Sequence, residues 1–334
     1  MKCYIGIDSG GTKTEAILAD ACGNILRRCT DRGCNPMDTG VQTTRETILS
    51  CLERLLSGAG GEPASLYAGI AGANHVKLDL NRSISQKYGI PVVKIDDDRR
   101  ITVSSTLGHA DGCGLICGTG SSLSILREGQ PVHQVGGLGY LIDTGGSGFE
   151  LGQAALKQAF RCLDGRGPHT VLAELIREKL GKDPWDAFAD IYAGGRAYIA
   201  SFACTVFEGW KRGDGVCQRI VEEGAGALSE LTFAAERYFE GNFPIVMTGG
   251  IFTAYPEYVE LVKAGASKRA DMLMAAAPPV YGALVEAYYQ DGIRASAETR
   301  GNFQREYRRI RSSRTGGGAV SFQVPAGGFL REQE

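Results

Sequence analysis

Two glycine-rich segments combine a short apolar run with a turn of small and hydroxyl residues. The first is IGIDSGGTKTEAIL at 5–18, and the second is LICGTGSSLSI at 115–125. Glycine lets such a turn point its backbone N–H groups at an anion, and the hydroxyls add donors. Phosphate oxygens suit this nest. Asp8 would repel a bare phosphate, so its place before the first turn indicates a hydrated Mg²⁺ ion between the two.

Either turn alone could be an ordinary hairpin, for which Gly-Gly is sufficient. Two such turns in one chain favour phosphate binding. Neither matches a nucleotide motif of fixed spacing, because the Lys13-Thr14 step has the wrong register for GxxxxGK[ST] and no strand-GxGxxG-helix unit is present. A P-loop ATPase and a Rossmann dehydrogenase are therefore disfavoured.

A third glycine pair and a carboxylate cluster are further candidates. VMTGGIF at 246–252 ends an apolar run in Gly249-Gly250, which would let a flat ligand approach, although a tight turn explains it equally well. The cluster 96–98, in IDDDRRITVSSTLG, precedes the second turn. A helix N-terminus accounts for one or two of its carboxylates. Three adjacent carboxylates repel each other, which is more typical of a phosphoryl-transfer site.

The elements that position these segments alternate between strands and helices. Strands are predicted at 2–7, 15–19, 25–29, 66–71, 92–95, 114–117, 123–126 and 244–247, and helices at 41–56, 100–107, much of 147–238, 255–263 and 279–289. This alternation indicates an α/β protein. The layout of strand, glycine turn and strand occurs at the start and again after residue 111, which suggests a duplication.

The duplication predicts a boundary near residue 110, between a first lobe at 1–110 and a second lobe at 111–290. A basic extension follows at 291–334, and for its segment 294–314 we expect a solvated surface helix with a loose end, with a partner or oligomer contact as the alternative.

Composition excludes several classes of protein. The 334 residues are 43% hydrophobic and 22% charged with a net charge of -2, so neither nucleic acid nor a membrane is an expected partner. No apolar run reaches the length of about 18 residues that a membrane span needs. The 10 cysteines are expected to be reduced and the protein cytoplasmic, since no apolar leader precedes Cys3.

Taken together and in order along 4–290, these segments resemble the superfamily of acetate and sugar kinases, heat-shock proteins and actin. More narrowly, the chain resembles the BadF/BadG/BcrA/BcrD ATPase-like family, which includes N-acetylglucosamine kinases. The resemblance implies two actin-like (ribonuclease H-like) lobes around an ATP cleft. It places the sugar and phosphate on the side of the N-terminal lobe at 1–110 and the nucleotide on the side of the lobe at 111–290, whose last helix would return to the first lobe. It also implies ATP-dependent phosphorylation of an amino sugar with ATP and Mg²⁺ as cofactors, and a homodimer is one possible assembly.

The resemblance assigns roles to individual residues. Asp8 would orient Mg²⁺ through water, and Asp98, with Asp97 second, would be the catalytic base. The phosphates would be lined by Gly10, Gly11, Thr12, Lys13, Gly118, Thr119, Gly120 and Ser121, the adenosine by Gly249 and Gly250, and the sugar by Asn35, Gly72, Gly137 and Asp143.

One segment departs from the family pattern. The sugar loop usually reads GGWG followed by a GDEGS-like run, but here it is GGLGYLIDTGGSGFELG. Leu138 replaces the aromatic residue and Thr144-Gly145 replaces the acidic pair. Either Asp143 substitutes by a shift of one residue or a sugar contact is lost.

Two other functions remain open from the sequence. One is the activator ATPase of 2-hydroxyacyl-CoA dehydratases, which shares an iron-sulfur cluster between two subunits. The second turn lacks the activator-like basic-aromatic continuation, and no cysteine has a convincing cluster context. The other is a non-enzymatic sensor of a sugar or nucleotide.

Overall fold

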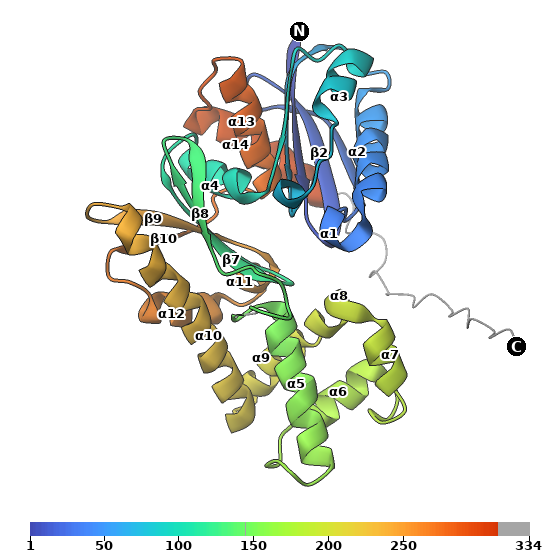
Figure 1. Cartoon of the computed structure of the whole chain (residues 1–334), viewed down its shortest axis with the longest axis vertical. Coiled ribbons are helices and arrows are strands. Elements are labelled where there is room, and N and C mark those ends of the chain that lie inside the picture. Colours follow the sequence, from blue (N-terminus) through green and yellow to red (C-terminus); the bar gives the residue numbers. More distant parts are fainter. Residues whose placement is uncertain (144, 313–334) are drawn as a thin grey trace, which may run out of the picture.

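The computed structural model describes residues 1–143 and 145–312. Two five-stranded sheets follow one another along the long axis of the molecule, and a group of helices lies beyond the second sheet (Figure 1). Among the described residues, no helix has the length and apolar character needed to cross a membrane.

The first sheet has the strand order β3-β2-β1-β4-β5. Its strands are β1 (Lys2–Ser9), β2 (Lys13–Asp20), β3 (Ile25–Arg32), β4 (Glu62–Ile70) and β5 (Val92–Asp96). The first three form an antiparallel meander, and β4 and β5 run parallel to β1. The meander predicted from the apolar runs is confirmed.

Helices pack against both faces of this sheet. Successive side chains of a strand point to opposite faces, so Ile5 and Ile7 pack with α2 (Val41–Leu56), whereas Tyr4 packs with α13 (Pro279–Gln290). The shorter helices of this region are α1 (Pro36–Thr39), η1 (Ala73–His75) and α3 (Asn81–Tyr88).

The second sheet repeats the topology of the first, in the order β10-β9-β6-β7-β8. Its strands are β6 (Gly112–Cys117), β7 (Ser121–Arg127), β8 (Gln130–Val135), β9 (Phe243–Thr248) and β10 (Ala270–Met274). Again three strands form an antiparallel meander, and two more continue in parallel. The layout expected from the two glycine turns is thus present in both sheets, and the lobe boundary predicted near residue 110 falls between α4 (Arg99–Leu107) and β6.

A long insertion between β8 and β9 forms the helical end of the molecule, as the sequence predicts. Its helices are α5 (Gly148–Leu163), α6 (Leu172–Leu180), α7 (Phe188–Ala193), α8 (Gly195–Ala200), α9 (Ala203–Lys211), α10 (Gly215–Ala235) and η2 (Glu236–Tyr238). After β9 come α11 (Gly250–Ala254) and α12 (Pro256–Gly265), and α12 packs on α10. One apolar cluster joins these helices to the second sheet.

Two crossing helices, α4 and α13, lie between the sheets. Helix α13 packs on β1 and β4, whereas α4 contacts α13, β6 and β9. The crossing is close, because a Cβ atom on Gly282 would lie 1.8 Å from the backbone oxygen of Ile101. A side chain at residue 282 would therefore separate the two helices.

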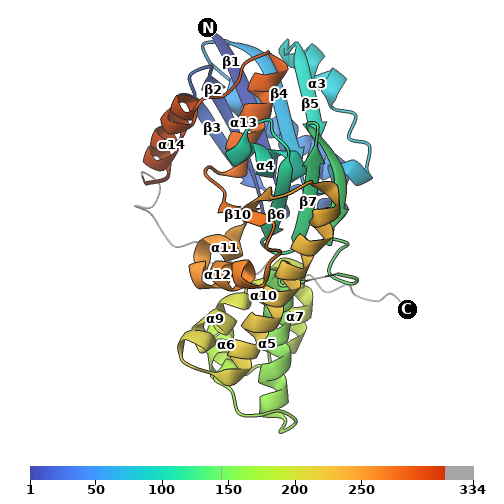
Figure 2. The ribbon, with the colours of Figure 1, turned by 90° about the vertical axis from the view of Figure 1, so that its left-hand side faces the viewer.

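The final described helix, α14 (Ala297–Ser312), lies against the first sheet (Figure 2). Phe303 is fully buried and packs with its ring tilted against Tyr281 of α13, and Tyr307 donates a hydrogen bond to Glu15 of β2. The expected helix is present, but it is not simply solvated, since one of its faces belongs to the core. The predicted loose end beyond residue 312 lies outside the described residues.

Candidate functional site

Strand register brings the two acidic candidates of the first sheet to the same edge. Asp8 of β1 is level with Gly69 of β4, and Gly69 is level with Asp96 of β5. Neighbouring strands are about 4.8 Å apart, so the backbones of Asp8 and Asp96 are separated by roughly 10 Å. Because these three strands are parallel, their carboxyl ends open onto one site.

The first turn, between β1 and β2, is fixed by backbone hydrogen bonds on one side and is open to solvent on the other. The N–H of Gly10 donates to the Lys13 oxygen at 3.0 Å, and the N–H of Cys34 donates to the Gly10 oxygen at 3.2 Å. A Cβ atom on Gly33 would lie 2.3 Å from the Gly11 backbone, so residue 33 must be small, whereas Gly10 faces open space. Gly11, Thr12 and Lys13 are exposed. The turn can therefore accept a ligand.

Lys13 does not point freely into solution. Its Nζ lies 2.8 Å from Oε2 of Glu15, a buried carboxylate that also accepts hydrogen bonds from Arg28 and Tyr307. Burial alone would raise the pKa of Glu15, but the positive charges of Lys13 and Arg28 hold it below its ordinary value. Glu15 thus orients the Lys13 ammonium group next to the first turn.

The carboxylates at 96–98 differ sharply in their partners. Asp96 accepts from the Tyr67 hydroxyl at 3.2 Å and lies 3.4 Å from Lys94 Nζ. Asp97 is buried and forms an ion pair with Arg99, whose backbone N–H it also accepts at 3.0 Å. For Asp98, no side-chain hydrogen bond or ion pair is found with the described residues. Two of the three carboxylates are therefore occupied and one is available.

Asp8 and Asp98 form an electrostatically unfavourable pair. Burial raises the pKa of Asp98 to about 6, with a further contribution from Asp97. Burial also raises the pKa of Asp8 to about 7, and the charge of Asp98 adds to this shift. Two half-buried carboxylates that repel each other would be stabilised by a divalent cation. A cation held at Asp8 would relieve this repulsion, so the surroundings of Asp8 fit the implied Mg²⁺ and leave Asp98 available.

The two residues predicted on the sugar side of the first sheet lie together. Asn35 precedes α1, and its side-chain oxygen accepts the Met37 N–H at 2.9 Å. Gly72 has a left-handed φ of 79°, and a Cβ atom on it would lie 2.5 Å from Oδ1 of Asn35. Gly72 therefore makes room for the Asn35 side chain, whose amide N–H groups have no hydrogen-bond partner among the described residues.

The second turn, between β6 and β7, is tied to the start of α5. The Gly118 oxygen accepts the Gly148 N–H at 2.8 Å, and the Thr119 oxygen accepts the Phe149 N–H at 3.0 Å. Gly118 faces open space. The Ser121 hydroxyl donates to the Gly145 oxygen at 2.6 Å. These contacts orient the carbonyls of the turn towards the helix.

The two glycines after β9 have different surroundings. Gly249 has a φ of 121°, and a Cβ atom there would lie 2.1 Å from the Cys117 oxygen at the end of β6. Gly250 begins α11, and a Cβ atom on it would have no other atom within 4 Å. The tight-turn explanation thus accounts for Gly249, and Gly250 is the one that leaves room for a ligand.

The predicted sugar loop, whose sequence departs from the family pattern, packs against the second turn. Gly137 has a left-handed φ of 73°, and a Cβ atom on it would lie 2.6 Å from Ser122 Cβ. The N–H of Asp143 donates to the Gly139 oxygen at 2.8 Å. Thr144 lies outside the described residues. Gly137 is required by packing, so its predicted sugar contact has an alternative structural explanation.

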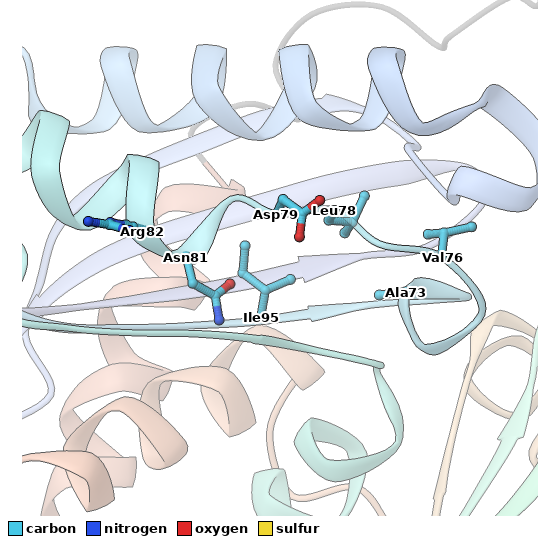
Figure 3. Close-up of a pocket in the computed structure, with 7 residues that line it drawn as sticks. All are labelled: Ala73, Val76, Leu78, Asp79, Asn81, Arg82 and Ile95. Atoms are coloured by element: carbon cyan, nitrogen blue, oxygen red, sulfur yellow. The ribbon is translucent and has the colours of Figure 1, made fainter.

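A separate hollow of about 510 Å³ lies beside β5, between that strand and the segment from η1 to α3 (Figure 3). Its lining includes Ala73, Asp79, Arg82 and Ile95. Ala73 follows Gly72 directly, but none of the predicted site residues lines the hollow. We therefore do not assign the nucleotide or the sugar to it.

Comparison with known families decides the relationship of this chain. The model of the BadF/BadG/BcrA/BcrD ATPase family matches residues 5–287. The chain belongs to the BadF/BadG/BcrA/BcrD ATPase family. Helix α14 lies beyond the matched residues.

Relatives within this ATPase family have named activities. An N-acetyl-D-glucosamine kinase of Dictyostelium discoideum is 28% identical over 281 residues, which cover 74% of this chain and 84% of the relative. An N-acetylmuramic acid/N-acetylglucosamine kinase of Clostridium acetobutylicum is 30% identical over 243 residues, covering 68% and 77% of the two chains.

A crystal structure of a proposed N-acetylglucosamine kinase from Chromobacterium violaceum shares the fold. Its TM-score is 0.69 at 23% identity, with 85% of this chain and 98% of that chain covered. The α/β fold with two actin-like units, predicted from the sequence, is confirmed.

Sequence reasoning missed two charged residues next to the predicted site. Glu15, which holds Lys13, lies in the first glycine segment, and its burial could have been suspected from the apolar residues around it. Arg196 of α8 lies against the second turn, where a Cβ atom on Gly120 would be 2.5 Å from Nη2 of Arg196. No local motif marks Arg196, because the contact joins distant parts of the chain.

Proposed function

We propose that this ATPase-family protein transfers the γ-phosphoryl group of ATP to a hydroxyl of an amino sugar such as N-acetylglucosamine. Membership of the family and the activities of its relatives support the kinase assignment. The observation that carries the proposal is the pair of half-buried carboxylates, Asp8 and Asp98, at the carboxyl edge of the first sheet.

In this proposal Asp98 is the general base. Its carboxylate has no partner among the described residues, and its pKa of about 6 lets it be ionised at neutral pH while still accepting a proton. Asp97 is less suitable, since its oxygens are engaged by Arg99. Asp98 would therefore take the proton of the attacking sugar hydroxyl.

Asn35 and Gly72 would orient the acceptor sugar. The Asn35 oxygen is used by the α1 backbone, so its two amide hydrogens remain for sugar oxygens. The N-terminal sheet would thus supply both the base and the sugar contact. Asp143, which lies in the departing loop, remains a candidate for a second sugar contact.

The turns at 10–13 and 118–121 would hold the phosphates, and Gly250 would leave space for the adenosine. Gly10 and Gly118 face open space, so an anion could approach the backbone of both turns closely. Asp8 would hold Mg²⁺ through water, and this ion would neutralise phosphate charge during transfer. A cytoplasmic location fits this use of ATP, and a homodimer stays a prediction.

The test is ADP formation by the purified protein with Mg²⁺-ATP and a panel of N-acetylglucosamine, glucosamine, N-acetylmannosamine, N-acetylmuramic acid and glucose. We expect ADP release that depends on an amino sugar and is lost with EDTA. Sugar-independent ATP hydrolysis would favour the activator ATPase, and nucleotide binding without turnover would favour the sensor.

The cysteines give little support to the activator alternative. A cluster shared by two copies needs exposed cysteines, and the exposed ones are Cys22, before β3, and Cys204, in α9. They lie in different parts of the fold. Within residues 1–143 and 145–312, no three His, Cys, Asp or Glu side chains are grouped to hold a metal ion.

A further inference from the structure

The helical insertion places one cation against the second phosphate-type turn. Arg196 lies in α8, and its Nη2 would be 2.5 Å from a Cβ atom on Gly120. The absence of a side chain at residue 120 is what admits the guanidinium. This contact brings a positive charge to a turn whose other features already suit an anion.

The same guanidinium faces the departing sugar loop. The Cζ atom of Arg196 lies 5.9 Å from the centre of the Tyr140 ring, within the range of a cation–π contact. Tyr140 belongs to the segment that contains Gly137 and Asp143. Arg196 therefore contacts both the predicted phosphate turn and the segment that contains the predicted sugar loop.

Among the described residues, no carboxylate forms an ion pair with Arg196. Its Nε is buried and has no hydrogen-bond partner there. A buried donor without an acceptor is costly, so such a group needs an explanation. The other cations near the site are engaged, Lys13 by Glu15 and Arg99 by Asp97.

We propose that Arg196 binds the terminal phosphate of the nucleotide and neutralises the phosphoryl group as it is transferred. A guanidinium offers a planar set of donors that matches phosphate oxygens, and the terminal phosphate would supply the acceptor that Nε lacks. This inference rests on the proposed kinase function. It gives the helical insertion a direct part in phosphate binding.

A purely structural role makes a different prediction. If Arg196 only packs on Tyr140, its replacement alters stability and affects all nucleotides equally. If Arg196 binds the terminal phosphate, the loss follows the number of phosphates. The comparison of AMP with a non-hydrolysable ATP analogue separates these roles.

The experiment is calorimetric titration of AMP-PNP, ADP and AMP, with Mg²⁺, into the full chain and its variants. For Arg196→Gln we expect AMP-PNP to bind about 10- to 100-fold more weakly, because a charge-assisted phosphate contact is lost, with AMP changed less than twofold. Arg196→Lys should recover part of the affinity. The matched control is Arg166→Gln, since Arg166 is an exposed arginine whose ion pair is with Asp164.

Gly120→Ala perturbs the same contact, since its methyl group would displace the guanidinium, and it also changes the phosphate turn to which Gly120 belongs. It should reproduce the selective loss of AMP-PNP binding. Unchanged AMP-PNP affinity in Arg196→Gln, or an equal loss for all three nucleotides, would overturn the proposal. If either result is found while the wild-type protein still phosphorylates an amino sugar, the proposed kinase function stands and only the role of Arg196 is wrong. A wild-type protein that binds no nucleotide would overturn both.

Discussion

Replacement of Asp98 by asparagine should lower activity and raise stability at the same time. Burial and the neighbouring Asp97 raise the pKa of Asp98 from 3.8 to about 6. The folded protein therefore disfavours the ionised carboxylate by about two pH units, which corresponds to about 3 kcal/mol at 1.36 kcal/mol per unit. Asparagine has the same size and no charge, so Asp98→Asn should recover up to this amount.

The sign of the effect fixes its pH dependence. Below about pH 4 the carboxyl group is protonated in both the folded and the unfolded chain, so it contributes no penalty. The penalty develops as pH rises from about 4 to 6 and is complete above the folded pKa of about 6. Denaturant unfolding should therefore show the stabilisation by Asp98→Asn at pH 8 and little of it at pH 4.

Activity should move in the opposite direction. A positioned base contributes about 10²–10⁴-fold in rate, so Asp98→Asn should reduce kcat with the best sugar by that factor and leave ATP binding nearly unchanged. In the wild type, kcat/KM should fall about tenfold per pH unit below pH 6, because the protonated carboxyl group cannot accept a proton.

Asp97→Asn is the matched control for this prediction. Asp97 is buried and paired with Arg99, so its neutralisation leaves Arg99 without its partner and should destabilise the fold. Normal turnover in Asp98→Asn, or a loss of stability at pH 8, would refute the assignment of Asp98 as a strained catalytic carboxylate. Such a result would make it a structural helix-start residue.

Four further substitutions test other parts of the site and the docking of α14. Gly249→Ala should lower the free energy of unfolding by more than the cost of about 1–3 kcal/mol that its φ of 121° imposes, because its methyl group would also lie 2.1 Å from the Cys117 oxygen. Gly250→Ala should keep the melting temperature and weaken ATP binding; equal melting temperatures of the two variants would contradict this. Asn35→Asp keeps the acceptor for the α1 backbone but removes the amide donor, so KM should rise for the sugar and not for ATP in steady-state kinetics. Tyr307→Phe removes a hydrogen bond to the Glu15 carboxylate and should lower the free energy of unfolding in urea by about 2 kcal/mol. An unchanged unfolding midpoint would contradict the contribution of α14 to the core.

The regular parts of the fold could be predicted from the sequence because their signals are local. Apolar runs broken by glycine turns gave the strands of both meanders, and helical spacing of apolar residues gave α2 and α13. Strand β10 was missed, since its five residues are short and lack flanking turn signals. Helix α14 was expected, but the burial of Phe303 depends on α13 and could not be inferred from its basic neighbourhood.

The site was predictable in outline and not in detail. The sequence placed three carboxylates at 96–98, but only the Arg99 contact distinguishes Asp97 from Asp98. It also marked both glycines after β9, yet the approach of Cys117 to Gly249 depends on how β6 and β9 pair. Arg196 was missed for the same reason, since its contact with the second turn is made by tertiary packing.

The most direct test of the central claim is the stoichiometry of products from the wild-type protein. ATP and N-acetylglucosamine, or the best amino sugar of the panel, should yield equal amounts of ADP and sugar phosphate, followed by ³¹P NMR and mass spectrometry. We expect one phosphorylated amino sugar for each ADP in the presence of Mg²⁺. ADP accompanied by inorganic phosphate, with no sugar phosphate, would contradict the assignment of this protein as an amino-sugar kinase.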